Sequence, residues 1–149
     1  MDNVTSYWVS IYILHSLQKY YKKHPNINQL YYLVLEFYIK YFKLYKQCLF
    51  TDEIIIVKPI GIAFSDMKYK YVAFGAMPIF MQVKEPDLPK NIKNIIDTVI
   101  SNNYDVSQSE AIHRMKKPYG LWDYFYCTKG VDTLIGEREV REWYEKFGK

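Results

Sequence analysis

The sequence predicts a mainly helical α+β domain, with about five helices around a central apolar helix and a small antiparallel strand element. Three features of the chain carry this prediction. Apolar side chains spread nearly all the way round residues 30–44, a β-branched run occupies residues 53–57, and other segments show one apolar face at helical spacing. The chain has 149 residues, half of them hydrophobic, which suits a single domain over residues 1–149.

The first two helices are marked by their boundaries as well as by their apolar residues. Residues 4–22 predict a first helix, because apolar side chains recur there three and four positions apart. Pro25 cannot continue that helix, and Asn26 or Asn28 is expected to cap the next one. The central helix is predicted over residues 29–46, and its apolar character on every side indicates that other helices wrap it.

The middle of the chain predicts the strand element. Residues 53–57 are typical of a buried strand, which Pro59 and Gly61 end. Residues 69–74 alternate loosely between polar and apolar side chains, so they predict either a second strand or a short helix. A proline-rich connector follows at residues 84–90.

Three further helices are predicted after this connector. Residues 89–102 place their isoleucines and valine on one face, with a proline near the first turn. Residues 107–117 begin with Ser107 and Glu110, a spacing that predicts a capping box. Residues 137–147 close the chain with a last amphipathic helix.

Composition limits the classes of protein to consider. The aromatic fraction of 18% argues against a disordered chain, although the 16 tyrosines fit an A/T-rich genome as well as an aromatic binding surface. The net charge of +4 is mildly basic and permits contact with nucleic acid or with an acidic protein. We expect a cytoplasmic protein without a signal peptide or a membrane span, because the chain has neither a cleavage-site pattern nor 18 consecutive uncharged apolar residues.

No set of residues predicts an enzyme, a metal site or a cofactor site. His15, His24 and His113 lack the spacing of metal ligands. Cys48 and Cys127 have no metal or redox spacing either, and we expect both to be reduced thiols buried in the core. A cysteine-dependent hydrolase ranks last among the functions considered, and unchanged activity in the Cys48→Ser and Cys127→Ser variants would dismiss it.

Glu36 is the one carboxylate inside the central apolar helix. A buried carboxylate either pairs with a cation or has a raised pKa. No second carboxylate is placed to share acid–base work with it, so we expect an ion pair.

Lysines and aromatics interleave in the segments KYYKK, KYFKLYK and MKYKY. In a protein that binds nucleic acid, lysines meet phosphates while tyrosines stack on bases. The alternative is that the lysines line solvent-facing sides of helices. The nucleic-acid-binding regulator, of phage or mobile-element origin, is the second functional hypothesis, and it would use Lys19, Lys22, Lys23, Lys40, Lys43 and Lys46.

The order of several motifs resembles the Panacea, or SocA-like, antitoxin-associated family. In that family a Tyr-rich helix leads through a short strand to a Gly-Pro-Val segment. Residues 28–33 (NQLYYL) and 48–54 (CLFTDEI) resemble the helix and the step into the strand, and residues 59–64 (PIGIAF) lie where Gly-Pro-Val is expected, with the order changed to Pro-Ile-Gly. A later Thr-His pair and Pro-Trp step of the family resemble residues 112–113 (IH) and 118–119 (PY). The resemblance covers residues 28–147, so residues 1–25 form an extra N-terminal helix.

The resemblance implies a role in binding rather than in catalysis. Proteins of this family are encoded beside toxins and neutralise them by direct contact, and one branch hands its toxin to a cellular protease. The signature positions in this sequence are Pro59, Gly61, His113 and Pro118. We interpret His113 as a hydrogen-bonded core residue and Pro118 as a turn residue. For partner contacts we expect exposed aromatic anchors, namely Tyr69, Tyr71, Phe74, Tyr119 and Trp122.

Overall fold

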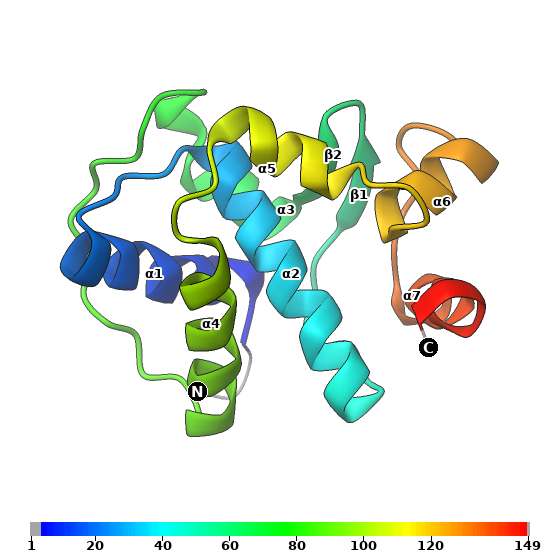
Figure 1. Cartoon of the computed structure of the whole chain (residues 1–149), viewed down its shortest axis with the longest axis horizontal. Coiled ribbons are helices and arrows are strands. Elements are labelled where there is room, and N and C mark those ends of the chain that lie inside the picture. Colours follow the sequence, from blue (N-terminus) through cyan, green and yellow to red (C-terminus); the bar gives the residue numbers. More distant parts are fainter. Residues whose placement is uncertain (1–3, 149) are drawn as a thin grey trace.

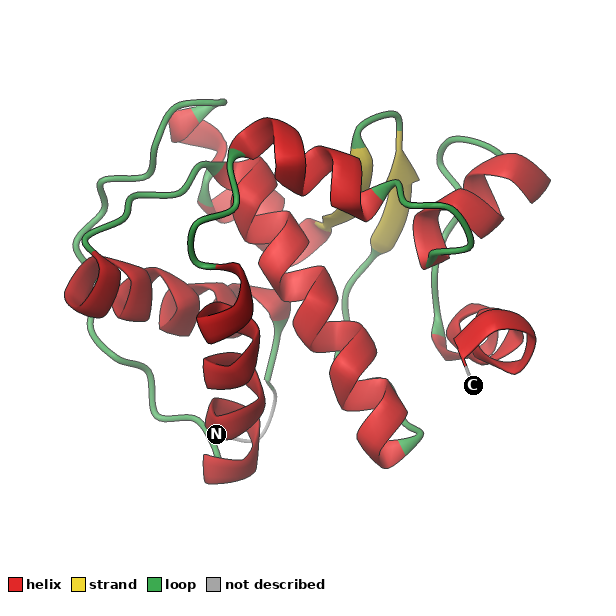
Figure 2. Ribbon diagram, in the orientation of Figure 1, coloured by secondary structure: helices red, strands yellow, loops and turns green. Residues whose placement is uncertain are grey.

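A computed structural model describes residues 4–148 and, within them, shows seven α-helices and a two-stranded antiparallel sheet that lies to one side of α2 (Figures 1 and 2). The predicted class, mainly helical α+β, is confirmed. The helices beyond the expected five are two short ones, α3 (Ser65–Lys70) and α6 (Leu121–Thr128). Residues 1–3 and 149 of the expected domain lie outside the described range.

The first two helices begin and end close to the predicted positions. Helix α1 (Ser6–Ser16) continues into a π-helical turn (Leu17–Tyr21), and α2 runs over Ile27–Tyr45. Asn26, not Asn28, caps α2. The Asn26 side chain accepts a hydrogen bond from the Gln29 backbone N–H at 3.0 Å, and the Gln29 side chain accepts one from the Asn26 N–H at 2.8 Å. This reciprocal pair satisfies two backbone donors that a helix start would otherwise leave unpaired.

Helix α2 is central, as its composition predicts. It contacts α1, α4 (Lys90–Asn103), α5 (Gln108–Met115) and the strand β2, and it crosses the middle of the molecule in Figure 1. Leu30, Val34 and Phe37 are completely buried along it. A helix packed on several sides needs apolar side chains on several sides, which explains why its apolar stripe is so wide.

The strands form a hairpin. Strand β1 (Ile55–Lys58) pairs with β2 (Gly61–Phe64), so that Lys58 lies opposite Gly61. Of the two alternatives predicted for residues 69–74 the short helix is confirmed, because the segment ends α3 and continues as a 3₁₀ helix (Val72–Phe74), and the alternative of a second strand is wrong. The segment at Pro59, which we expected only to end a strand, is a two-residue turn that sends the chain straight back into β2.

A later segment extends the hairpin on the other side of β1. The Val57 N–H donates to the Thr133 carbonyl at 3.0 Å, and the Val57 carbonyl accepts from the Asp132 N–H at 2.8 Å. The Ile135 N–H donates to the Ile55 carbonyl at 2.8 Å. This segment, residues 131–135, therefore covers the outer edge of β1, which would otherwise offer unpaired backbone groups to other chains.

Gly61 occupies a place that excludes a side chain. Its φ is 152°, and a Cβ atom added there would lie 2.7 Å from Met115 Cε. Met115 is itself buried, so it has little room to move away. The hairpin turn and α5 therefore approach each other closely because residue 61 is a glycine.

We expect Gly61→Ala to lower the unfolding free energy by about 1–3 kcal/mol, since a side chain is strained at this φ and would press on Met115. Denaturant unfolding measures the change. Gly75→Ala is the matched control, because Gly75 also has a positive φ (55°) but open space around it. A loss in Gly61→Ala no larger than in Gly75→Ala would show that contact with Met115 contributes nothing.

The helices that follow α4 along the chain are short. The Ser107 hydroxyl accepts from the Glu110 N–H at 3.2 Å, as the predicted capping box requires. The Glu110 carboxylate does not return to the Ser107 backbone; it pairs with Arg114, one helical turn later, at 2.7 Å. The guanidinium offers this carboxylate a charged donor, which explains why only half of the box forms. Helix α7 (Glu137–Trp143) and a π-helical turn (Tyr144–Gly148) end the described chain.

Aromatic rings fill the space between α2 and the hairpin. Phe64, at the end of β2, is completely buried. Its ring centroid lies 5.8 Å from that of Phe50, 6.0 Å from that of Tyr38 and 6.3 Å from that of Tyr31. Phe64 thus joins the hairpin to the central helix through ring contacts on several sides.

Candidate functional site

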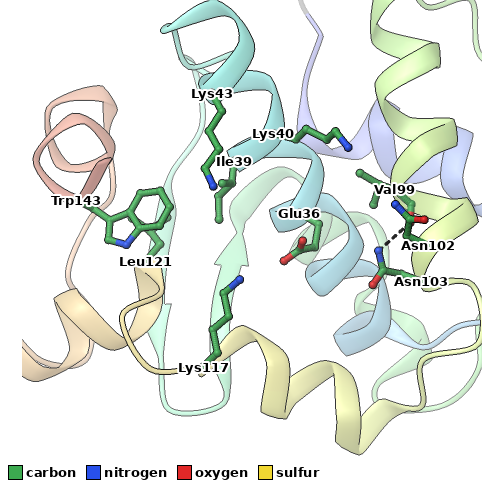
Figure 3. A pocket seen from close by; sticks show the side chains of 10 residues that line it. All are labelled: Glu36, Ile39, Lys40, Lys43, Val99, Asn102, Asn103, Lys117, Leu121 and Trp143. Carbon is green, nitrogen blue, oxygen red and sulfur yellow. Dashed lines mark hydrogen bonds between the residues drawn. The ribbon is translucent and has the colours of Figure 1, made fainter. Parts of the chain in front are cut away.

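A groove of about 320 Å³ opens between α2, α4, the turn before α6, and α7. Lys40 and Lys43 come from the second half of α2, and Lys117 comes from the turn after α5. In Figure 3 the Lys43 and Lys117 side chains extend toward Glu36, while Trp143 closes one side. We call this hollow the lysine groove.

The lysine groove has an excess of positive charge. Its three lysines face the single negative charge of Glu36, and within residues 4–148 none of these four side chains forms a salt bridge. The expected ion pair of Glu36 is therefore wrong, because Glu36 lies at the open wall of the groove and is only half-buried. Lys43 instead places its Nζ atom 5.8 Å from the centre of the Trp143 ring. A groove of this charge attracts anionic groups.

One wall of the groove is rigidly hydrogen-bonded. The side-chain oxygen of Asn103, Oδ1, accepts a hydrogen bond from the Tyr32 hydroxyl at 2.7 Å and another from Arg114 Nη1 at 3.0 Å. The Asn103 Nδ2 donates to the Val99 carbonyl at 2.8 Å, the contact drawn in Figure 3. Partial burial raises the pKa of Tyr32, which therefore stays protonated and keeps donating. These bonds tie α2, α4 and α5 together behind the lysines.

The lysines that the sequence singled out divide into two groups. Lys19, Lys22 and Lys23 lie at the end of α1, whereas Lys40, Lys43 and Lys46 lie on or just after the last turns of α2. Figure 1 places these two helix ends on opposite sides of the molecule. They do not form one surface, because the chain reverses direction between α1 and α2. Lys117 joins the second group from a distant part of the chain, and no local pattern marked it.

The predicted aromatic anchors fall into an exposed set and a buried set. Tyr69 and Tyr119 are 75% and 69% exposed, and Phe74 is half-buried. Tyr71 and Trp122 are 1% and 5% exposed, so the expectation that they are exposed anchors is wrong. Tyr71 shares a hydrogen bond with the Ser10 hydroxyl at 2.7 Å, and Trp122 Nε1 donates to the Lys58 carbonyl at 2.7 Å. Both rings pack inward and satisfy their polar atoms there.

The later signature positions lie at the surface. His113 is exposed, so its expected place in the core is wrong. The buried face of α5 is made by Ala111 and Met115, and a residue two positions from each points the opposite way. Pro118 lies in the exposed turn after α5, as predicted. Of the two earlier signature positions, Pro59 lies in the hairpin turn and Gly61 begins β2.

Sequence reasoning missed three exposed apolar side chains that follow α3. Val72, Met77 and Phe80 are 70%, 67% and 65% exposed, close to the value for Tyr69. We call these four residues the apolar strip. For Met77 and Phe80 the signal is the long segment without helix or strand at residues 75–89, since such loops inside a domain commonly serve binding.

The cysteines do not have the environment of nucleophiles. Cys48 is buried, as expected, and desolvation raises the pKa of its thiol. Cys127 is exposed, contrary to expectation, because the buried face of α6 is made by Leu121, Trp122 and Phe125. Partial desolvation and the neighbouring Asp123 carboxylate raise the pKa of Cys127. Both thiols therefore resist forming the reactive thiolate.

Glu53 is a partly buried carboxylate that serves the fold. Its Oε1 accepts from the Ser6 N–H at 2.8 Å, and its Oε2 accepts from the Ser6 hydroxyl at 2.7 Å and from the Asp66 N–H at 3.2 Å. Ser6 begins α1 and Asp66 lies in the first turn of α3, so one side chain satisfies donors at two helix starts. Desolvation by burial raises the pKa of Glu53, and these hydrogen bonds offset that effect only in part.

The described part of the chain holds no cluster of three or more histidine, cysteine, aspartate or glutamate side chains that could bind a metal ion. No helix in residues 4–148 combines the length and the apolar character that crossing a bilayer requires.

The chain matches no protein-family model, no curated protein and no solved structure. The likeness to the Panacea family therefore rests on the sequence motifs alone.

Proposed function

We propose that this chain is a non-enzymatic antitoxin or proteolytic adaptor that binds and neutralises a toxin protein in the cytoplasm. The apolar strip carries this proposal, because its four large side chains remain 65% to 75% exposed. The four side chains lie within residues 69–80, and we infer that they form one exposed patch of the kind that marks protein-binding surfaces. The resemblance in the sequence names the kind of partner.

Neutralisation would proceed by occlusion, with the apolar strip covering a functional surface of the toxin. Tyr69 is the best anchor, since an exposed tyrosine brings a large contact area at a low cost in side-chain entropy. An adaptor must also hold a protease while it holds the toxin. The lysine groove and exposed Tyr119 offer surfaces apart from the apolar strip for that second contact.

Co-expression with the product of the neighbouring gene tests the proposal. We expect that product to stop growth when it is expressed alone, and this chain to restore growth and to co-purify with it. Val72→Asp should weaken the complex at least tenfold in calorimetry, because a charge placed in an apolar contact has no partner. Leu44→Asp is the matched control, since Leu44 is 59% exposed in the last turn of α2.

Restored growth without a complex would contradict occlusion. If Val72→Asp and Leu44→Asp weaken toxin binding equally, the apolar strip is not part of the contact, although the complex itself still forms.

The lysine groove favours a second candidate, a nucleic-acid-binding regulator. Three lysines around one hollow form no salt bridge with any residue from 4 to 148, which suits them to phosphates. Binding of this kind weakens steeply with salt, and Lys43→Ala should reduce the salt slope by about one. Titration of a labelled DNA duplex at several salt concentrations distinguishes this candidate from a protein-only role.

A further inference from the structure

A second hollow, of about 190 Å³, lies beside β2 and the start of α2. Its walls are mainly apolar and come from the hairpin and from Met115 of α5. Ile60, at the hairpin turn, is 49% exposed at its edge. We call this hollow the hairpin pocket. It is lined by different residues from the lysine groove and the apolar strip.

Asn28 lines the hairpin pocket and is 7% exposed. Its carboxamide forms no hydrogen bond within residues 4–148, although nearby Asn26 uses its side chain to cap α2. The Asn28 amide atoms are not among the buried polar atoms that lack a partner, namely Thr5 Oγ1, His15 Nδ1 and Tyr38 Oη, so they face the open pocket and are available to a ligand. A carboxamide can donate to a carbonyl and accept from an N–H, which are the two polar groups of a peptide bond.

Two lysines lie beside the pocket, and they differ in whether an acidic side chain neutralises their charge. Lys58 is neutralised by Asp132, with 2.7 Å between Nζ and Oδ1. Lys68, on α3, is exposed and forms no salt bridge or hydrogen bond within the described residues. The pocket therefore combines apolar walls, an unpaired carboxamide and one unneutralised positive charge.

We infer that the hairpin pocket takes one apolar side chain from an extended acidic segment of the partner protein. The peptide group of that residue would pair with the Asn28 carboxamide, and a neighbouring carboxylate would lie on Lys68. The volume favours a single side chain, because pockets for whole cofactors or drug-sized ligands are larger, at about 300–1,000 Å³. This inference rests on the proposed function, since it assigns the chemistry of the bound partner.

Capped tripeptides test the chemistry without knowledge of the partner. The probe is acetyl-Asp-Leu-Asp-amide, and its controls are acetyl-Asp-Ala-Asp-amide and acetyl-Lys-Leu-Lys-amide. In titrations followed by ¹⁵N NMR, we expect shifts at residues 60–63 and at the Asn28 side-chain amide. We expect the probe to bind at least fivefold more tightly than either control. Equal binding of the three peptides, or shifts elsewhere, would overturn the inference.

Variants separate binding from stability. Asn28→Ala should weaken probe binding at least threefold and leave the melting temperature unchanged, because the Asn28 amide forms no hydrogen bond within residues 4–148 that the variant would lose. Asn102→Ala, an exposed asparagine of the lysine groove, should change neither. Lys68→Ala should weaken binding, whereas Lys70→Ala on the same helix should not. A lower melting temperature with unchanged affinity in Asn28→Ala would assign the residue to the fold and overturn the inference.

The same variants address the partner. Suppose that the wild-type pocket binds the probe but that Asn28→Ala binds the toxin as tightly as the wild type does. The pocket would then take a free small ligand and not a segment of the toxin, which overturns the assigned occupant. If no toxin partner is found, the proposed function fails, and the peptide titration still decides whether the pocket has the assigned chemistry.

Discussion

We expect Phe64→Ala to lower the unfolding free energy by about 3–5 kcal/mol, the range typical of removing a fully buried phenylalanine. Phe64 is 0% exposed, and its ring meets the rings of Tyr31, Tyr38 and Phe50. Removing it leaves a cavity where the hairpin joins the central helix. Domains of this size are stable by about 5–15 kcal/mol, so this one change removes a large part of the total.

Urea unfolding followed by circular dichroism measures the loss in Phe64→Ala. Phe80→Ala is the matched control, because Phe80 is 65% exposed and its removal should stay within about 0.5 kcal/mol. A loss below about 1 kcal/mol for Phe64→Ala would contradict the ring packing described here.

We expect Glu53→Ala to lower the unfolding free energy by about 2–4 kcal/mol, because three hydrogen-bond donors lose their acceptor together. The first turns of α1 and α3 should loosen in the same variant, and faster hydrogen exchange of the Ser6 and Asp66 amides would report this. Glu36→Gln is the control, since Glu36 forms no salt bridge within residues 4–148. Slow exchange of both amides in Glu53→Ala would refute the role of this carboxylate at the two helix starts.

The raised pKa of Glu53 predicts a pH dependence with a definite sign. The folded protein keeps the proton at pH values where the unfolded chain, with a pKa of about 4.3, has lost it. The contribution of Glu53 to stability is therefore fully present below that value and declines as pH rises through the folded-state pKa. We expect the difference in unfolding free energy between wild type and Glu53→Gln to fall over this window. A difference that rises with pH would mean that the hydrogen bonds outweigh desolvation.

Periodicity alone identified the longest elements. Helices α2 and α4 have apolar residues on the faces that they bury, so their positions follow from local sequence. The loose alternation of residues 69–74 fits neither period, so it left a strand and a short helix both open, and the turn at Pro59 decided where the second strand lies. Short helices such as α3 and α6 lack enough turns for a helical period to be seen.

The candidate site was harder to predict than the fold, because it depends on contacts between distant parts of the chain. Tyr69 and Tyr71 look alike in sequence, yet a helical turn sends one to solvent and the other to Ser10. Lys117 reaches the lysine groove only because α5 packs across α2. The unpaired state of Asn28 is visible only once its neighbours are placed.

Because β1 pairs with residues 131–135, its outer edge stays uncovered during synthesis until that later segment has been made. Asp132 follows its salt-bridge partner Lys58 by 74 positions, so a ribosome working at about 5–20 residues per second needs roughly 4–15 s to supply it. During that interval the nascent hairpin has one open side that could pair with another nascent chain. A premature stop before residue 131 would make that exposure permanent, and we expect such a product to aggregate or to be degraded rather than to accumulate.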